Sequence, residues 1–177
     1  VGDEIVTPAL SFIATSNAIR AAGFTPKFVD IEKETLNIDP DKIENAITEK
    51  TKAIMVVHTM GKPCDMEKIC HIAQKHNLIV IEDACEAHGA KFQGRYIGKW
   101  GHMSCYSFYI AHLICCGEGG MVSTDREDIH ETIFSTRCHG RSGFYFDHPL
   151  FGLNSKMNDM EASLGLEGIG KFHDTFN

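Results

Sequence analysis

The segment from Ser107 to Gly120, SFYIAHLICCGEGG, holds the residue types of this chain that are best suited to chemistry. Ser107 follows an apolar run that ends at Tyr106, and a glycine cluster closes the segment. A strand that ends in a serine and a glycine-rich turn can aim a hydroxyl and backbone N–H groups at an anion. His112, five residues after Ser107, adds an ionisable imidazole in an otherwise apolar loop. This spacing predicts an anion-binding loop with a candidate acid or base.

Asp83 is a second candidate, at the end of the run LIVIED. Ligands of α/β sheets bind at the carboxyl ends of the strands, where this carboxylate is expected. Simpler interpretations stand beside both predictions. A carboxylate after a strand often caps the next loop, a serine often closes a turn, and a lone histidine is most often a surface or hydrogen-bonded residue.

The elements that must position these residues alternate between strand and helix patterns along the chain. Apolar runs such as AIMVVH and LIVIED predict strands that are buried on both faces. The predicted strands cover 4–8, 25–30, 53–58, 78–83, 103–108 and 121–124, and the predicted helices cover 14–22, 40–47, 66–76, 126–139 and 158–172. Residues 141–153 are expected to form a loop. The pattern predicts an α/β fold with a mostly parallel sheet sandwiched by helices.

Three motifs, SFYxxHxxxxGEGG, IEDACEAHGA and PALSFIAT, resemble the nucleotide-sugar aminotransferases of the DegT–DnrJ group, within PLP fold type I. In most of that family, the position of His112 is the lysine that binds PLP covalently. An imidazole has no primary amine and cannot do so. Histidine at this position is typical of a smaller branch, the PMP-dependent sugar 3-dehydratases, in which it is the base. The resemblance covers essentially the whole chain.

The resemblance implies PLP or PMP as cofactor and gives roles to four further residues. Asp83 would pair with the pyridine nitrogen, where a carboxylate keeps the ring protonated and able to accept electrons. Phe12 would stack on the ring, although a core phenylalanine is the simpler interpretation. Ser107 would bind the cofactor phosphate. Glu86 is at a position that is often glutamine in the family, and it is expected beside the ring.

The segment FGLNSKMND resembles another family motif, GYNxRM. Asn154 would then reach the phosphate of a neighbouring subunit, which implies a homodimer with a shared active site. Leu153 replaces the usual tyrosine and Lys156 the usual arginine. A lysine is a point charge where arginine is a planar fork, so the family role is not carried over to Lys156.

These residues leave three functions open. The leading hypothesis is 3-dehydration of a 4-keto-6-deoxy nucleotide sugar, with His112 as base and Asp83 supporting the ring. The second is an aminotransferase relative that uses another base. The third is a catalytically silent paralogue that binds a nucleotide sugar or a partner, since loss of the lysine is equally expected there.

Composition sets limits on the class of protein. The formal net charge of −7 and the lack of a basic stripe argue against nucleic acid as a partner. The seven cysteines form no CxxC pair and suggest free thiols in a reducing cytoplasm. Only three of them lie beyond His112, so neither an iron–sulfur cluster nor another metal is expected. No apolar run reaches the ~20 residues of a membrane span.

The family resemblance also bears on domain organisation. Residues 1–177 are interpreted as the central part of the large, cofactor-binding domain of a fold type I PLP-dependent transferase. The family would place a segment with a Gly/Ser/Thr phosphate-binding turn before this part, and a small domain after it.

Overall fold

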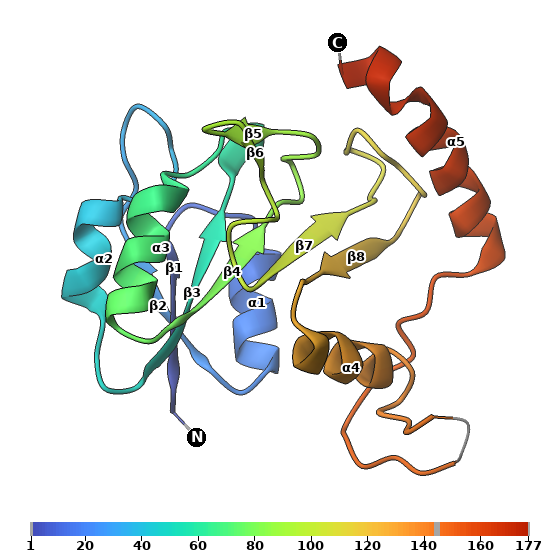
Figure 1. Ribbon diagram of the computed structural model, residues 1–177, viewed down its shortest axis with the longest axis horizontal. Helices are drawn as coiled ribbons and strands as arrows, with labels where there is room; N and C mark the ends of the chain where they lie inside the picture. Colours follow the sequence, from blue (N-terminus) through green and yellow to red (C-terminus); the bar gives the residue numbers. More distant parts are fainter. Residues whose placement is uncertain (1, 144–145, 177) are drawn as a thin grey trace. The chain divides into compact units, whose positions relative to one another are not determined.

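The computed structural model describes residues 2–143 and 146–176. The chain divides into two compact units, Val1–Tyr106 and Ser107–Asn177. Figure 1 shows the elements of both units.

Strands and helices alternate along the first unit, as the sequence predicts. In chain order they are β1 (Glu4–Pro8), α1 (Ile13–Ala21), β2 (Thr25–Val29), α2 (Pro40–Ala46), β3 (Thr51–Val57), the short 3-10 helix η1 (Thr59–Gly61), α3 (Met66–Lys75), β4 (Ile79–Asp83), β5 (Lys91–Phe92), β6 (Arg95–Tyr96) and β7 (Met103–Ser107). The last residue of β7 is the first residue of the second unit.

The long strands form a parallel sheet in the order β2-β1-β3-β4-β7. β3 and β4 are paired from Ala53 with Ile79 to Val57 with Asp83. β4 continues this register onto β7, where Asp83 is paired with Cys105. The predicted fold class, a mostly parallel α/β sheet, is confirmed.

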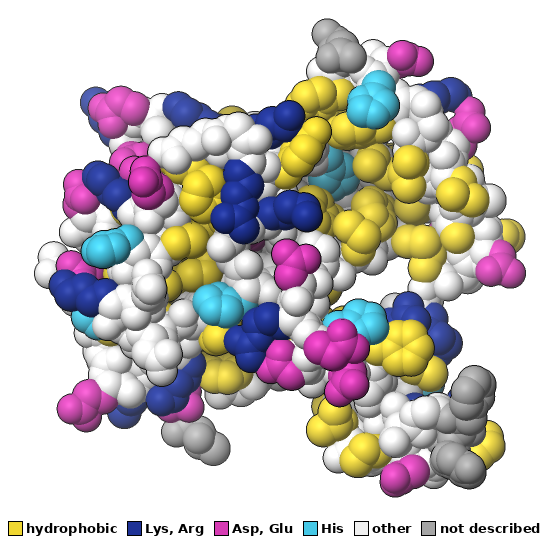
Figure 2. Space-filling model, viewed as in Figure 1, with side chains coloured by type: hydrophobic (Ala, Val, Ile, Leu, Met, Phe, Trp, Pro, Cys, Tyr) yellow, Lys and Arg dark blue, Asp and Glu magenta, His cyan; other side chains and the backbone are white. Residues whose placement is uncertain are grey.

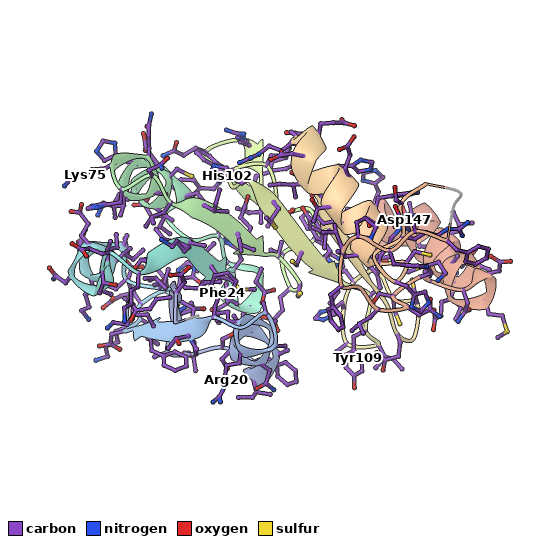
Figure 3. All side chains as sticks on the ribbon, turned by 90° about the horizontal axis from the view of Figure 1, so that it is seen from below. Arg20, Phe24, Lys75, His102, Tyr109 and Asp147 are labelled. Carbon is purple, nitrogen blue, oxygen red and sulfur yellow. The ribbon has the colours of Figure 1, made fainter. Side chains whose placement is uncertain are left out.

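The core lies on both faces of this sheet because successive strand residues point to opposite sides. On one face, Val6, Ile54 and Val80 pack with residues of α2 and α3 such as Ile43 and Ile69. The other face is smaller and joins α1 to the sheet through Ile5, Ile19, Ala53 and Met55. Figure 1 shows α2 and α3 side by side. In Figure 3, Lys75 of α3 and Arg20 of α1 lie on opposite sides of the strands.

Two of the predicted helix starts are fixed by side-chain caps. The Asp39 carboxylate accepts a hydrogen bond from the Asp41 N–H, and Asp65 accepts one from the Lys68 N–H. Such caps satisfy N–H groups that the first helical turn leaves unpaired. The predicted ends of the first-unit elements lie within two residues of the observed ones. His58, for example, leaves β3 and adopts a non-strand conformation.

The antiparallel hairpin of β5 and β6 was not predicted. Its strands have two residues each, which is too short for a hydrophobic period. Gln93 and Gly94 form its turn, with φ of 47° and 79°. Two consecutive positive φ values are typical of a type I′ hairpin turn, for which Asn-Gly is the usual signal.

The second unit contains β8 (Gly120–Ser123), α4 (Glu127–Thr136) and α5 (Asp159–Phe176). The prediction that α4 reaches His139 is wrong. The chain reverses there, because His139 and Gly140 have φ of 61° and 74°. The backbones of Cys138 and Asn154 form an isolated antiparallel β-bridge. The prediction that α5 ends at Phe172 is also wrong, since the helix continues to Phe176.

α5 begins with reciprocal capping. The Asn158 side chain accepts hydrogen bonds from the N–H groups of Met160 and Glu161, and the Glu161 carboxylate accepts one from the Asn158 N–H. Of the predicted loop 141–153, residues 144 and 145 lie outside the described residues, and the others form neither helix nor strand. Within the described ranges, no helix combines the length and apolar character that crossing a membrane requires.

Candidate functional site

Asp83 is the last residue of β4 and is half-buried. Its carboxylate accepts hydrogen bonds on both oxygens. The Thr15 hydroxyl donates to Oδ2 at 3.1 Å, and the Cys85 N–H donates to Oδ1 at 3.3 Å. The Asp83 carbonyl accepts the N–H of His58, which follows β3. The carboxylate is therefore held at the ligand-binding edge of the sheet.

The start of α1 lies against this carboxylate. Thr15 is buried in the first turn of the helix, and its hydroxyl lies 2.7 Å from the Ser11 hydroxyl. Phe12 immediately precedes the helix and is 80% exposed. The Phe12 ring is therefore available to a ligand beside the residues that hold Asp83. A core phenylalanine would be buried instead.

Glu86 lies three residues after Asp83 and is exposed. Its carboxylate accepts a hydrogen bond of 2.6 Å from the N–H of Met60, in η1. Met60 has a φ of 53°, a conformation that side chains rarely adopt. Glu86 thus stabilises the turn after β3.

A buried hydrogen-bond network next to Asp83 was not predicted from the sequence. Glu82 is fully buried, and its carboxylate accepts the N–H groups of Gly98, Trp100 and Gly101 at 2.8, 2.9 and 2.6 Å. His58 Nδ1 accepts the Cys64 N–H, so His58 Nε2 carries the proton and donates to Glu82 at 3.3 Å. A glutamate inside the apolar run LIVIED is the signal that could have revealed this network.

Burial alone would raise the pKa of Glu82, but its hydrogen bonds with His58, Gly101 and Gly98 outweigh this effect and lower the pKa overall. The network ties β4 to the turn after β3 and to the loop before β7. Asp83 is thereby attached to a rigid strand end.

Two thiols border Asp83. Burial raises the pKa of the Cys105 thiol to about 11, and the charge of Asp83 adds to the effect. Burial, followed by a hydrogen bond with Asp83, also raises the pKa of the Cys85 thiol. Both cysteines are free thiols in the structure. At neutral pH they are protonated and place no further negative charge beside the carboxylate.

Ser107 is the last residue of β7 and His112 lies in the loop between β7 and β8, both in the second unit (Figure 1). Two hydrogen bonds close this loop, from the Phe108 N–H to the Gly119 carbonyl and from the Cys116 N–H to the Phe108 carbonyl. The Ser107 hydroxyl accepts the Tyr109 N–H at 3.2 Å and so also closes a local turn.

His112 is half-buried within the same loop. Its N–H donates to the Tyr109 carbonyl, and its ring lies edge-on to Tyr109, with 6.4 Å between the ring centroids. Of the glycines after it, Gly117 and Gly119 have positive φ, whereas Gly120 begins β8. The sequence predicts close packing and positive φ at Gly119 and Gly120; the positive φ is found at Gly119 and not at Gly120.

Asn154 is exposed in the second unit, and its side-chain oxygen accepts a hydrogen bond from the Lys156 ammonium group. The structure thus brings Asp83, Glu86 and the start of α1 to one edge of the first unit. Ser107, His112 and Asn154 lie in the second unit. Within residues 2–143 and 146–176, no cluster of three or more His, Cys, Asp or Glu side chains could hold a metal ion.

A cavity of the first unit lies elsewhere. It has a volume of about 660 Å³ and is lined by the end of α2, the start of β3 and the chain before β4, including Glu44, Thr48 and His76. These residues lie at the amino ends of β3 and β4, opposite the edge that carries Asp83. Because ligands of parallel sheets bind at the carboxyl ends, we place the candidate site at Asp83.

The residues at that edge fit a pyridine ring. A carboxylate has about four acceptor positions, so Asp83 can accept a ring N–H in addition to the Thr15 hydroxyl and the N–H and thiol of Cys85. Phe12 offers an exposed aromatic surface. These features define an α/β protein with a carboxylate at the ligand edge of a parallel sheet. The chain belongs to the DegT/DnrJ/EryC1/StrS aminotransferase family, and the match to this family covers residues 1–177.

The proteins that match the chain include a regulatory protein, a 3-dehydratase and an aminotransferase. It is 45% identical to a pleiotropic regulatory protein of Geobacillus stearothermophilus, over 92% of this chain and 44% of that protein. It is 36% identical to GDP-4-keto-6-deoxy-D-mannose 3-dehydratase of Yersinia pseudotuberculosis, over 96% of this chain and 48% of the relative. The structure of an aminotransferase from Psychrobacter cryohalolentis superposes with a TM-score of 0.93 at 38% identity, covering 98% of this chain and 47% of the other. The chain thus spans about half the length of these relatives.

Proposed function

We propose that the full-length protein is a PLP- or PMP-dependent enzyme of nucleotide-sugar modification, which removes the C3 hydroxyl of a 4-keto-6-deoxy sugar with His112 as base. The observation that carries this proposal is His112 itself. It occupies the family's lysine position, and the chain has no lysine between Lys99 and Lys156. A residue of this loop therefore cannot hold PLP as a Schiff base, whereas His112 can carry out acid–base chemistry.

When bound, PMP supplies an amine for the sugar ketone and a ring that accepts an electron pair. Asp83 would hold a proton at the ring nitrogen, Phe12 would lie against the ring, and Ser107 would donate its hydroxyl to the phosphate. His112 would act as the base that takes up a proton and as the acid that delivers it to the departing C3 hydroxyl. Imidazole suits both steps because it exchanges protons close to neutral pH.

Glu86 is proposed to lie beside the ring while it holds the Met60 turn. We further propose that Asn154 reaches the cofactor phosphate of a second subunit, so that the enzyme is a homodimer with a shared active site. We also propose that the enzyme is located in the cytoplasm. Sedimentation of the active full-length protein tests the assembly. A monomer with full activity would overturn the shared site.

Amino transfer is the second candidate function. The structure of the Psychrobacter cryohalolentis aminotransferase matches this chain as well as the dehydratase sequence does, at 38% against 36% identity. A transferase would need another base in place of the lysine. The 45% identity to a pleiotropic regulatory protein keeps a third possibility, a paralogue without catalysis.

One assay separates the three functions. Full-length protein is incubated with PMP and a 4-keto-6-deoxy nucleotide sugar, with and without glutamate as amino donor, and the products are identified by mass spectrometry. Loss of the C3 oxygen from the sugar, with release of ammonia and in an amount that matches the PMP converted to PLP when glutamate is absent, supports dehydration. An amino sugar that accumulates beyond the amount of PMP when glutamate is present supports transfer. PMP binding without either product supports the silent paralogue. In parallel, borohydride treatment with PLP should leave no cofactor on the loop around His112.

A further inference from the structure

The Thr15 hydroxyl is placed between two oxygen groups. It lies 3.1 Å from Asp83 Oδ2 and 2.7 Å from Ser11 Oγ. A hydroxyl has one proton to donate, and a carboxylate can only accept. The Thr15 proton is therefore directed to Asp83, and Thr15 in turn accepts the proton of Ser11. The result is a two-step chain of hydrogen bonds that ends on the Asp83 carboxylate.

The local chemistry of α1 indicates that these hydroxyls do not serve the helix. Ser and Thr near a helix start usually cap its free N–H groups. Here the N-cap residue is Phe12, and no side chain caps the helix. Thr15 is buried. Its hydroxyl contacts the carboxylate of Asp83, 68 positions along the chain, instead of a group of its own helix. A buried hydroxyl that leaves its own helix uncapped points to a role at Asp83.

The two donors on Asp83 restrict its carboxylate from both sides. Thr15 holds Oδ2, and the Cys85 N–H holds Oδ1. Rotation of the carboxylate would break at least one of these bonds. The Thr15 bond comes from another element, so a substitution at Thr15 removes it without changing β4 or the residues after it.

We infer that Thr15, supported by Ser11, is a positioning residue that fixes the Asp83 carboxylate for the ring nitrogen of the cofactor. This inference rests on the proposed function, because it assigns Asp83 to that nitrogen. A hydrogen bond to a charged group is stronger than one between neutral groups. Its loss lets the carboxylate turn and weakens the hold of Asp83 on the ring proton.

The test uses full-length protein loaded with PMP that is labelled with ¹⁵N in the ring. The ¹⁵N chemical shift reports protonation of the ring nitrogen across a pH series, independently of turnover. Thr15→Val keeps the shape but removes the hydroxyl. It should lower the pH at which the ring nitrogen loses its proton by about one unit, and weaken PMP binding about tenfold. Thr15→Ser, which keeps the hydroxyl, should restore both values.

Control variants separate the possible failures. Asp83→Asn should abolish the protonation, and Ser11→Ala should give a smaller change than Thr15→Val. If Thr15→Val leaves the ¹⁵N titration and the PMP affinity unchanged, or if Thr15→Ser is as impaired as Thr15→Val, the inference is wrong while the proposed function stands. If the unmodified protein binds no PMP, or if Asp83→Asn does not alter the titration, the proposed function fails and the inference fails with it.

Discussion

The two units bury their side chains very differently. Among the described residues, every buried hydrophobic side chain except Cys116 lies in the first unit. In the second unit, α4 buries no residue and α5 buries only Gly165. Leu164, Leu166 and Ile169 of α5 are 58, 71 and 56% exposed. Figure 2 shows hydrophobic side chains gathered over α5, whereas charged side chains dominate the outer surface over α2 and α3.

This difference separates two ways of holding a functional group. Asp83 is fixed by side chains that the first unit itself buries, including Thr15 and the Glu82 network. The His112 loop is closed mainly by its own backbone hydrogen bonds and is surrounded by exposed apolar groups such as Ile110 and Leu113. Apolar surface of this kind is typical of an interaction site, and the proposed second subunit would be one way to cover it.

The largest expected effect tests the second unit. His112→Asn removes the proposed base but keeps a similar size. Turnover of the full-length protein by dehydration should fall by about 10²–10⁴-fold while PMP affinity is retained. The matched control is His130→Asn, an exposed histidine of α4 in the same unit. Undiminished dehydration by His112→Asn would remove His112 from the mechanism.

The second prediction contrasts the two cores directly. Ile54 is fully buried in β3, so Ile54→Ala should lower the free energy of unfolding of the 177-residue chain by about 2–5 kcal/mol. Leu166→Ala, on exposed α5, should cost at most about 0.5 kcal/mol. Urea denaturation monitored by circular dichroism measures both. Equal costs would mean that α5 is covered in solution and that the contrast does not hold.

The third prediction concerns acid stability of the first unit. The pKa of Glu82 is lowered from its ordinary value of 4.5, so its stabilisation is complete above pH 4.5 and is lost as the pH falls through the lower, folded-state pKa. Glu82→Gln should cost roughly 2–3 kcal/mol near neutral pH. It should also flatten the loss of stability below pH 4.5. Denaturation of both proteins from pH 7 to pH 3 measures this, and parallel curves would contradict it.

The smallest effect distinguishes two glycines of α5. A Cβ at Gly170 would meet nothing within 4 Å, so Gly170→Ala should stabilise the helix by about 0.5–1 kcal/mol. A Cβ at Gly165 would lie 2.6 Å from the Cys116 sulfur, so Gly165→Ala should disturb the His112 loop instead. Hydrogen exchange of the α5 amides should slow in the first variant only. Slower exchange in both would show that α5 is not packed on this loop.

The sequence was sufficient for the fold class because its signals are local. Buried runs such as LIVIED, and the capping residues Asp39 and Asp65, act over a few neighbouring residues. The hairpin around Gln93 was missed because its strands are too short to show a period. The end of α4 was misplaced because positive φ at His139 is set by the contact between Cys138 and Asn154.

The candidate site was predictable only in part. Asp83 could be placed at a strand end from the apolar run before it, and His112 stays a prediction from the motif around it. The contact between Thr15 and Asp83 spans 68 positions and depends on how α1 packs on the sheet. No local pattern contains that information. The same holds for Glu82, whose three N–H donors come from a loop 16 to 19 positions later.

The strand order has a consequence for how the protein is made. β1 lies between β2 and β3, so one edge of β1 stays open during synthesis until residue 57 has been made. β4 waits similarly for β7, which ends at residue 107. Parallel pairings of this kind form late and expose unpaired strand edges in the meantime. While residues 30 to 107 are being synthesised, the nascent chain therefore exposes strand edges that are open to pairing with other chains.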